Sequence, residues 1–257
     1  MRYGGETRPA IKRGSIIEFF GNDPTLVGSW SLDGNARDES RNGNNGTVTE
    51  AVVWPGRLRT SAYKFDGTND KIVVADNANI RVANLTAGAW INWLSYGTGN
   101  PGILGKTGGV GNAGWAIYTV ASSGLIRCRV STDGTNGYPF NSVTTIKQGV
   151  WSFICFTYDG GTSRIFINGN LDAIDTTPSG SLYASTADLE IGKFTDGEYF
   201  NGIIQDCFMF SRDLSSSAIS QYYQWAISEP RKYWFYSAEG IYKDSYFYRH
   251  LLSGRAA

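Results

Sequence analysis

The sequence has no excess of either charge, almost no histidine and no long apolar run. Its 257 residues include 23 basic and 23 acidic side chains, so the formal net charge is zero. A nucleic-acid binder needs a basic surface to neutralise phosphates, and we therefore expect no nucleic-acid partner. No run of 18 apolar residues occurs, which predicts that the chain does not insert into a membrane.

Cysteine is scarce as well. Cys128, Cys155 and Cys207 are far apart, form an odd number and lack metal-ligand spacing. This pattern predicts buried free thiols and synthesis in a reducing cytoplasm. The segment Met1–Pro9 has no apolar core, so we expect no signal peptide.

The scarcity of histidine limits catalysis. His250, the only one, lies in the last ten residues of the chain. No Ser-His-Asp or Cys-His arrangement can therefore be built within the central part of the sequence. The glycine-rich run Gly108–Gly114 lacks the Lys-Ser/Thr of a phosphate-binding loop and precedes a strand-like segment, which indicates a connecting loop. We expect a protein that is not an enzyme.

Glycine and aromatic residues are abundant, with 32 glycines and 14% aromatics. From Leu26 onward, apolar residues alternate with polar ones and turn residues recur at short intervals, which is typical of an antiparallel sandwich. Asn168-Gly169 predicts a two-residue hairpin, because both residues tolerate positive φ. The expected strands are Leu26–Leu32, Ala62–Phe65, Lys71–Val74, Ala87–Leu94, Gly102–Lys106, Gly114–Val120, Leu125–Ser131, Trp151–Tyr158, Thr162–Ile167, Asn170–Thr176, Leu189–Lys193 and Gly202–Phe210.

The fold class is therefore all-β: a two-sheet antiparallel jelly-roll sandwich over residues 26–225. One short helix is expected at Ser215–Trp225, with Asp213 or Ser215 as its cap. Residues 1–25 are interpreted as an extended arm with at most one strand, at Ile16–Phe20.

Residues 226–257 form an aromatic and basic tail. A segment this apolar is expected to pack against something, either a partner or its own sandwich. The residues expected to dock are Tyr233, Trp234, Phe235, Tyr236, Tyr246 and Phe247.

Six segments follow one another in a fixed order. They are Trp30–Gly34, Asp38–Gly46, Tyr63–Asp70, Trp151–Gly160, Phe166–Gly169 and Gly202–Asp206. In this order and at these gaps they resemble the laminin-G-like branch of the concanavalin A-like lectins, over about residues 26–224. The resemblance implies a concanavalin A-like jelly roll that serves binding. The helix followed by Pro230–Trp234 is also similar to the ending of laminin-G-like proteins encoded among phage structural genes.

A calcium site is the first candidate. The loop Asp38–Gly46 is rich in carboxylate and amide oxygens, which suit a hard cation. In the family an Asp of the final strand joins backbone oxygens of early loops, and the resemblance places Asp206 there, with Asp33 and Asp38 on the early segments. The alternative is that these residues only form Asx-turns and caps.

A sugar-binding surface is the second candidate. Aromatic faces pack against sugar CH groups, and amides or carboxylates bind hydroxyls. Residues on strands or loops that could line such a surface are Trp115, Tyr118, Tyr138, Asn141, Asp196 and Tyr199. Asp188 and Glu190 have the spacing of a glycosidase pair, but they lie in a segment that resembles an ordinary Leu-x-Ile-Gly strand of the family.

Two functions agree with these features. The first is a non-enzymatic virion structural or decoration protein of a phage-like capsid or tail. Its arms would contact other virion proteins or further copies of the chain, and its lectin-like face would bind surface glycans weakly. It would act at the virion surface after synthesis in the host cytoplasm. The alternative is an extracellular, calcium-stabilised carbohydrate-binding module.

Overall fold

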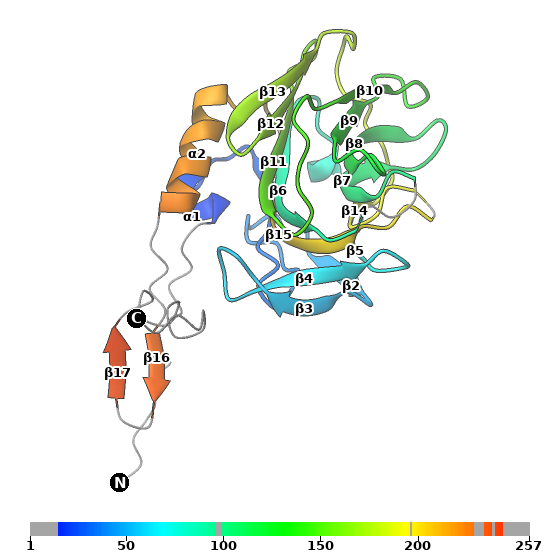
Figure 1. Cartoon of the computed structure of the whole chain (residues 1–257). Coiled ribbons are helices and arrows are strands. Elements are labelled where there is room, and N and C mark those ends of the chain that lie inside the picture. Colours follow the sequence, from blue (N-terminus) through cyan, green and yellow to red (C-terminus); the bar gives the residue numbers. More distant parts are fainter. Residues whose placement is uncertain (1–14, 96–98, 196, 229–233, 238–239, 244–257) are drawn as a thin grey trace.

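Two antiparallel sheets packed face to face make up the body of the molecule (Figure 1), which confirms the predicted jelly-roll sandwich. The structure is a computed structural model that describes residues 15–95, 99–195, 197–228, 234–237 and 240–243. Sheet A has the order β13-β12-β11-β6-β15-β4-β3, with β1 also paired to β15. Its strands are β1 (Leu26–Trp30), β3 (Val52–Pro55), β4 (Ser61–Asp66), β6 (Leu85–Trp93), β11 (Trp151–Tyr158), β12 (Ser163–Ile167), β13 (Asn170–Asp175) and β15 (Asn201–Phe210).

Sheet B has the order β10-β9-β8-β7-β14-β5-β2. Its strands are β2 (Gly46–Thr49), β5 (Lys71–Val74), β7 (Gly102–Thr107), β8 (Ala113–Thr119), β9 (Ile126–Val130), β10 (Tyr138–Asn141) and β14 (Leu189–Ile191). The connection from β5 to β6 contains the short 3-10 helix η1 (Ala78–Ile80).

Alternate residues of both sheets meet in one apolar core between them. Trp30, Phe65, Trp93 and Phe156 are among its fully buried side chains. The three cysteines are buried free thiols, as predicted, and burial raises the pKa of each. They therefore behave as small apolar side chains.

Strand β15 changes partner halfway along its length. Residues 201–204 pair with β4, and residues 207–210 pair with β1. The change occurs at a bulge, where Asp206 has φ 49° and the register with β6 shifts. Gln205 stabilises the bulge, because its side chain accepts hydrogen bonds from the backbone N–H of Arg57 and Leu58 and donates one to the Ser61 carbonyl.

Two helices cover the outer face of sheet A, as Figure 1 shows. Helix α2 (Ser216–Ser228) confirms the predicted helix and its cap, since the Ser215 hydroxyl accepts from the Ala218 N–H at 3.2 Å. Helix α1 (Ile16–Phe20) packs against α2. Together they bury a second apolar cluster that includes Trp90, Phe153, Phe208 and Tyr222.

Helix α1 corrects the expectation of an extended arm with a strand. Ser15 and Glu18 form a capping box, in which the Ser15 hydroxyl accepts from the Glu18 N–H at 3.1 Å and the Glu18 carboxylate accepts from the Ser15 N–H at 3.4 Å. The Phe19 and Phe20 rings contact Tyr222 at 5.7 and 6.1 Å between centroids. Residues from 15 onward thus contribute to the folded body.

Further strands were not expected from the sequence. β2, β3 and β10 lie at or near sheet edges, and the tail contains a hairpin of β16 (Trp234–Ser237) and β17 (Gly240–Lys243). No helix in the described part of the chain is long and apolar enough to span a membrane.

Candidate functional site

The outer faces of the two sheets differ in what lies over them. The outer face of sheet A is closed by α1 and α2. Within the described residues, no helix packs on the outer face of sheet B (Figure 1). The outer face of sheet B, called the open face below, therefore carries no helix, although its centre is covered: the outward-pointing Ala116 and Tyr118 are 1% and 4% exposed.

Strand register decides which side chains project from this open face. On β8 and β9, Trp115, Ile117 and Cys128 belong to the inner core. Their neighbours point the other way, because successive strand residues alternate between faces. One outward row contains Tyr118, Arg127 and Asn141, and the next contains Ala116, Arg129 and Pro139.

An aromatic stack and a guanidinium lie together in the first row. The Tyr118 and Phe194 rings stack at 4.3 Å between centroids with an interplanar angle of 10°. Arg127 donates from Nε to the Asn141 side-chain oxygen at 2.5 Å. Burial raises the pKa of Tyr118 to about 12, although the charges of Arg127 and Arg129 oppose this rise. The phenol therefore stays protonated at neutral pH and keeps its hydrogen-bond donor.

The other half of the open face carries a small ion-pair network. Glu190 on β14 accepts from the Nζ atoms of Lys71 and Lys193, both at 3.3 Å. With Arg127 and Arg129, these side chains give four cations and one carboxylate on a face of a chain with no net charge. These five side chains together carry an excess of positive charge.

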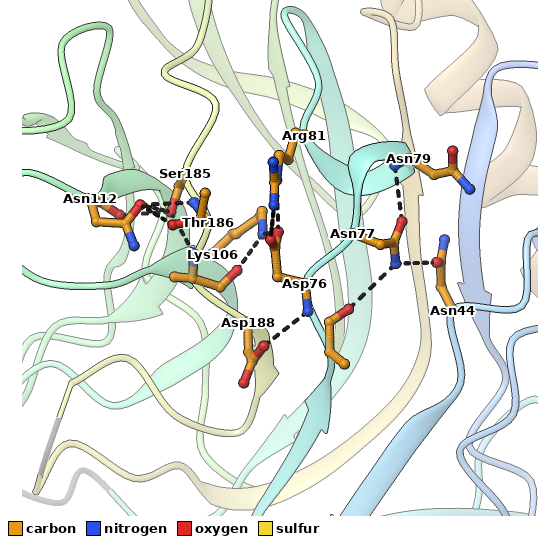
Figure 2. Close-up of polar contacts among 12 residues, drawn as sticks. Asn44, Asp76, Asn77, Asn79, Arg81, Lys106, Asn112, Ser185, Thr186 and Asp188 are labelled. Carbon is orange, nitrogen blue, oxygen red and sulfur yellow. Dashed lines mark hydrogen bonds and ion pairs between the residues drawn. The ribbon is translucent and has the colours of Figure 1, made fainter.

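A polar network ties the loops at one end of sheet B together (Figure 2). The buried Lys106 ammonium donates to the Asp76 carboxylate and to the Ala187 carbonyl, and Arg81 also binds Asp76. Arg81, and then Lys106, lower the pKa of Asp76, whereas burial lowers the pKa of Lys106 despite Asp76. The Asp188 carboxylate accepts from the Asp76 N–H at 2.9 Å.

The same network extends to two neighbouring loops. The Asn112 side-chain oxygen accepts from the Thr186 N–H at 2.8 Å, and the Asn77 amide donates to the Asn44 side chain at 2.8 Å. Asp188 is thus engaged in holding loops, and Glu190 is paired with lysines. Both carboxylates of the glycosidase-like pair make structural contacts.

The three carboxylates predicted to bind calcium lie in separate networks. Asp206 is 4% exposed and its Oδ1 lies 2.6 Å from Nε of Arg59. Asp33 accepts from the Ser61 N–H and hydroxyl, both at 2.8 Å. Asp38 accepts from the backbone N–H groups of Ser29, Ser40 and Asn44 and from the Ser40 hydroxyl, at 2.8 to 3.0 Å.

Each of these three residues makes protein contacts, and a calcium site that they share stays a prediction. No group of three His, Cys, Asp or Glu that could hold a metal ion occurs in the part of the chain that the structure describes. A guanidinium beside Asp206 also opposes a divalent cation there by charge. The Asx-turn interpretation describes Asp38 well, since its carboxylate closes the 38–44 loop onto β1.

We predict that calcium leaves the stability of the full chain unchanged. A ligand that binds only the folded state raises the midpoint of thermal unfolding. We expect the same midpoint with millimolar calcium and with a chelator, measured by calorimetry at matched ionic strength. A calcium-dependent rise that Asp38→Asn removes would restore the predicted site.

The residues predicted to bind sugars divide between the two faces. Trp115 is a correction: it is 2% exposed and lies in the inner core, where no sugar can reach it. Tyr138 packs against the same core. Tyr118 and Asn141 do project from the open face, although Tyr118 is itself 4% exposed beneath Phe194. Tyr199 is half-buried beside Lys193.

The remaining predicted residues cannot be placed in the same way. Asp196, Tyr233, Tyr246 and Phe247 lie outside the described residues. The run Trp234–Tyr236 belongs to β16, which pairs with β17.

Sequence reasoning missed three side chains of the open face. Arg127 and Arg129 flank a core cysteine in Ile-Arg-Cys-Arg-Val, and this alternation alone indicates two cations on one strand face. Phe194 gave no signal, because only the fold brings it onto Tyr118.

Comparison with known proteins identifies the superfamily of this chain. A laminin G-like model of the concanavalin A-like lectin/glucanases superfamily matches residues 66–220, more than half of the chain. The chain belongs to this superfamily. No curated protein sequence matches it.

Solved structures with the same fold are mostly binding domains. Domain 4 of AbnA, a GH43 extracellular arabinanase from Geobacillus stearothermophilus, in complex with arabinotriose, shows 18% identity and a TM-score of 0.65 over 78% of this chain and 98% of that one. The binding domain of Paraclostridial Mosquitocidal Protein 1 shows 16% identity and a TM-score of 0.65, over 79% and 52%. The botulinum neurotoxin serotype D ligand-binding domain in complex with N-acetylneuraminic acid shows 22% identity and a TM-score of 0.62, over 79% of this chain and 51% of that one. The chain spans about half the length of these toxin domains.

Proposed function

We propose that this chain is a non-enzymatic carbohydrate-binding domain whose site is the outer face of sheet B. The observation that carries the proposal is the unequal cover of the two sheets: α1 and α2 close one outer face, and the other presents an aromatic ring, an amide and guanidinium groups. These groups match the CH faces and hydroxyls of sugars. The arabinanase domain in complex with arabinotriose supports the proposal by its shared fold.

A glycan array with the full chain tests this function. We expect Phe194→Ala and Asn141→Ala to weaken binding to any glycan that the wild type retains. Leu171→Ala and Asn170→Ala are matched controls, because both residues lie on β13 of sheet A. If the control variants lose as much glycan binding as Phe194→Ala and Asn141→Ala, or if none of the four variants changes binding, the site does not lie on sheet B.

We further propose that the domain is displayed on a larger particle, as a virion structural or decoration protein. The chain enters the sandwich through α1 and leaves it through α2, and both helices pack on the outer face of sheet A. Helices α1 and α2 thus lie on the side away from the open face of sheet B, which supports attachment through the segments that flank them. The aromatic and basic composition of residues 226–257 supports the same role.

Light-scattering mass separates display from an isolated module. We expect the full chain to form a defined oligomer and a chain of residues 15–228 to be a folded monomer. The shorter chain begins at Ser15 because α1 packs on α2. Two monomers of equal thermal stability would count against docking by the tail.

A further inference from the structure

The two arginines of the open face lack acidic partners. Arg127 donates to the neutral Asn141 side chain, and Arg129 makes no hydrogen bond or ion pair with the described residues. Elsewhere on the same face, Lys71 and Lys193 share Glu190. In a chain with equal numbers of acidic and basic residues, two neighbouring guanidinium groups without a carboxylate partner indicate a place for an external anion.

Their spacing suits a ligand with carboxylate groups. Arg127 and Arg129 are two residues apart on β9, so their backbone positions are about 7 Å apart along the strand. A guanidinium matches a carboxylate with two parallel hydrogen bonds, a geometry that an ammonium cannot provide. The Tyr118–Phe194 stack lies in the Arg127 row and offers an aromatic surface to a sugar ring.

The backbone is shaped to hold Arg129 in place. A Cβ atom built on Gly137 would lie 1.9 Å from Nε and 2.5 Å from Cζ of Arg129. The guanidinium therefore rests directly on the Gly137 backbone, and any side chain there displaces it. This contact offers a way to move the charge without removing it.

We propose that the outer face of sheet B binds acidic glycans, with Arg127 and Arg129 pairing with sugar carboxylates. The inference rests on the proposed carbohydrate-binding function and narrows it to one class of ligand. Uronic acids and sialic acids both carry a carboxylate on the sugar, and the binding experiment below distinguishes these two kinds of ligand.

The experiment measures binding of the full chain by calorimetry. The probes are an oligogalacturonate, its methyl ester, in which the charge is removed from the same sugar, and sialyllactose. We expect the oligogalacturonate or sialyllactose to bind and the methyl ester to bind at least tenfold more weakly. Arg127→Gln and Arg129→Gln should each weaken acidic-glycan binding roughly tenfold or more, since each removes a charge-assisted pair.

Two further variants separate position from charge. Gly137→Ala keeps both arginines but displaces one guanidinium, and it should weaken acidic-glycan binding as Arg129→Gln does. Arg164→Gln is the matched control: it removes one cation from β12 of sheet A, where Arg164 pairs with Asp159. It should leave binding unchanged, and circular dichroism checks that each variant folds.

The possible failures are distinguishable. Equal binding of the oligogalacturonate and its methyl ester, unaffected by the arginine variants, overturns the acidic-glycan inference and leaves the carbohydrate-binding function standing. Binding of polyglutamate as tight as that of the acidic sugars also overturns the inference, because it indicates mere ion exchange. Absence of binding to every glycan on the array overturns both proposals.

Discussion

Arg59→Leu is expected to lower the free energy of unfolding by roughly 3–5 kcal/mol at pH 8, because it leaves the Asp206 carboxylate buried without its partner. The two side chains are 2% and 3% exposed, and Nε and Oδ1 are 2.6 Å apart. Oδ2 of Asp206 has no hydrogen-bond partner, so Arg59 is the main compensation for this charge. For a domain of this size we expect the midpoint of thermal unfolding to fall by roughly 10 °C.

The loss should depend on pH. Burial raises the pKa of Asp206 to about 6, although Arg59 lowers it. Burial likewise disfavours charge on Arg59, but Asp206 and Glu39 raise its pKa, so both partners are charged at neutral pH. A carboxyl with a raised pKa in the folded state contributes stability below its unfolded pKa, and this contribution is lost as pH rises through about 6. Without Arg59 the pKa of Asp206 rises further, so Arg59→Leu should cost less at pH 5 than at pH 8.

Two other variants test this explanation. The double change Arg59→Leu with Asp206→Leu removes both charges and should recover most of the lost stability. Arg164→Leu breaks a pair with Asp159 whose side chains are 27% and 29% exposed, and it should cost no more than about 1 kcal/mol. Denaturant unfolding at pH 5 and pH 8 measures the free energy of unfolding of each variant. An Arg59→Leu loss that is the same at pH 5 and pH 8 would show that an uncompensated Asp206 charge is not its cause.

The sequence predicted Asp206 as a special residue for a different reason. Its position in the final strand of the domain suggested a metal ligand, whereas in the structure its carboxylate pairs with Arg59, which is 147 residues earlier in the chain. No local pattern identifies such a partner. The bulge at residue 206 is equally hidden, because it arises where β15 exchanges β4 for β1.

The sandwich itself was predictable because buried strands leave apolar segments between turn residues: burial alternates along β5 and β9 and is continuous along β6 and β8. The strands that were missed lack this signal: β3 is exposed along its whole length, and β2 and β10 have no fully buried residue. The same alternation could have divided the sugar candidates. Trp115 and Tyr118 are three residues apart on one regular strand, so they face opposite sides of sheet B. Helix α1 was readable from Ser15 and Glu18, a capping box ahead of apolar residues.

The loop network at the end of sheet B leads to the second large effect. Asp76→Ala is expected to lower the free energy of unfolding by roughly 3–5 kcal/mol, because it removes the carboxylate that binds the buried Lys106 ammonium and leaves only the weaker influence of the Asp188 charge. Lys106 has 2% of its side chain exposed and would retain only the Ala187 carbonyl as a partner. Arg81 would lose its ion pair as well, but its side chain is 36% exposed and water can replace the carboxylate.

Removal of the lysine, the other partner of this ion pair, should lower the free energy of unfolding less. Lys106→Met removes the buried charge itself, and Asp76 keeps Arg81 beside it. We therefore expect a clearly smaller loss for Lys106→Met than for Asp76→Ala, and recovery when the two changes are combined. Hydrogen exchange at the Thr186 amide, which donates to Asn112, separates local loosening of the loops from global unfolding. A Lys106→Met loss as large as that of Asp76→Ala would show that the lysine stabilises the fold by its own packing. If Asp76→Ala costs more stability than Lys106→Met, as expected, then Asp76 is the residue that holds these loops together beside the open face.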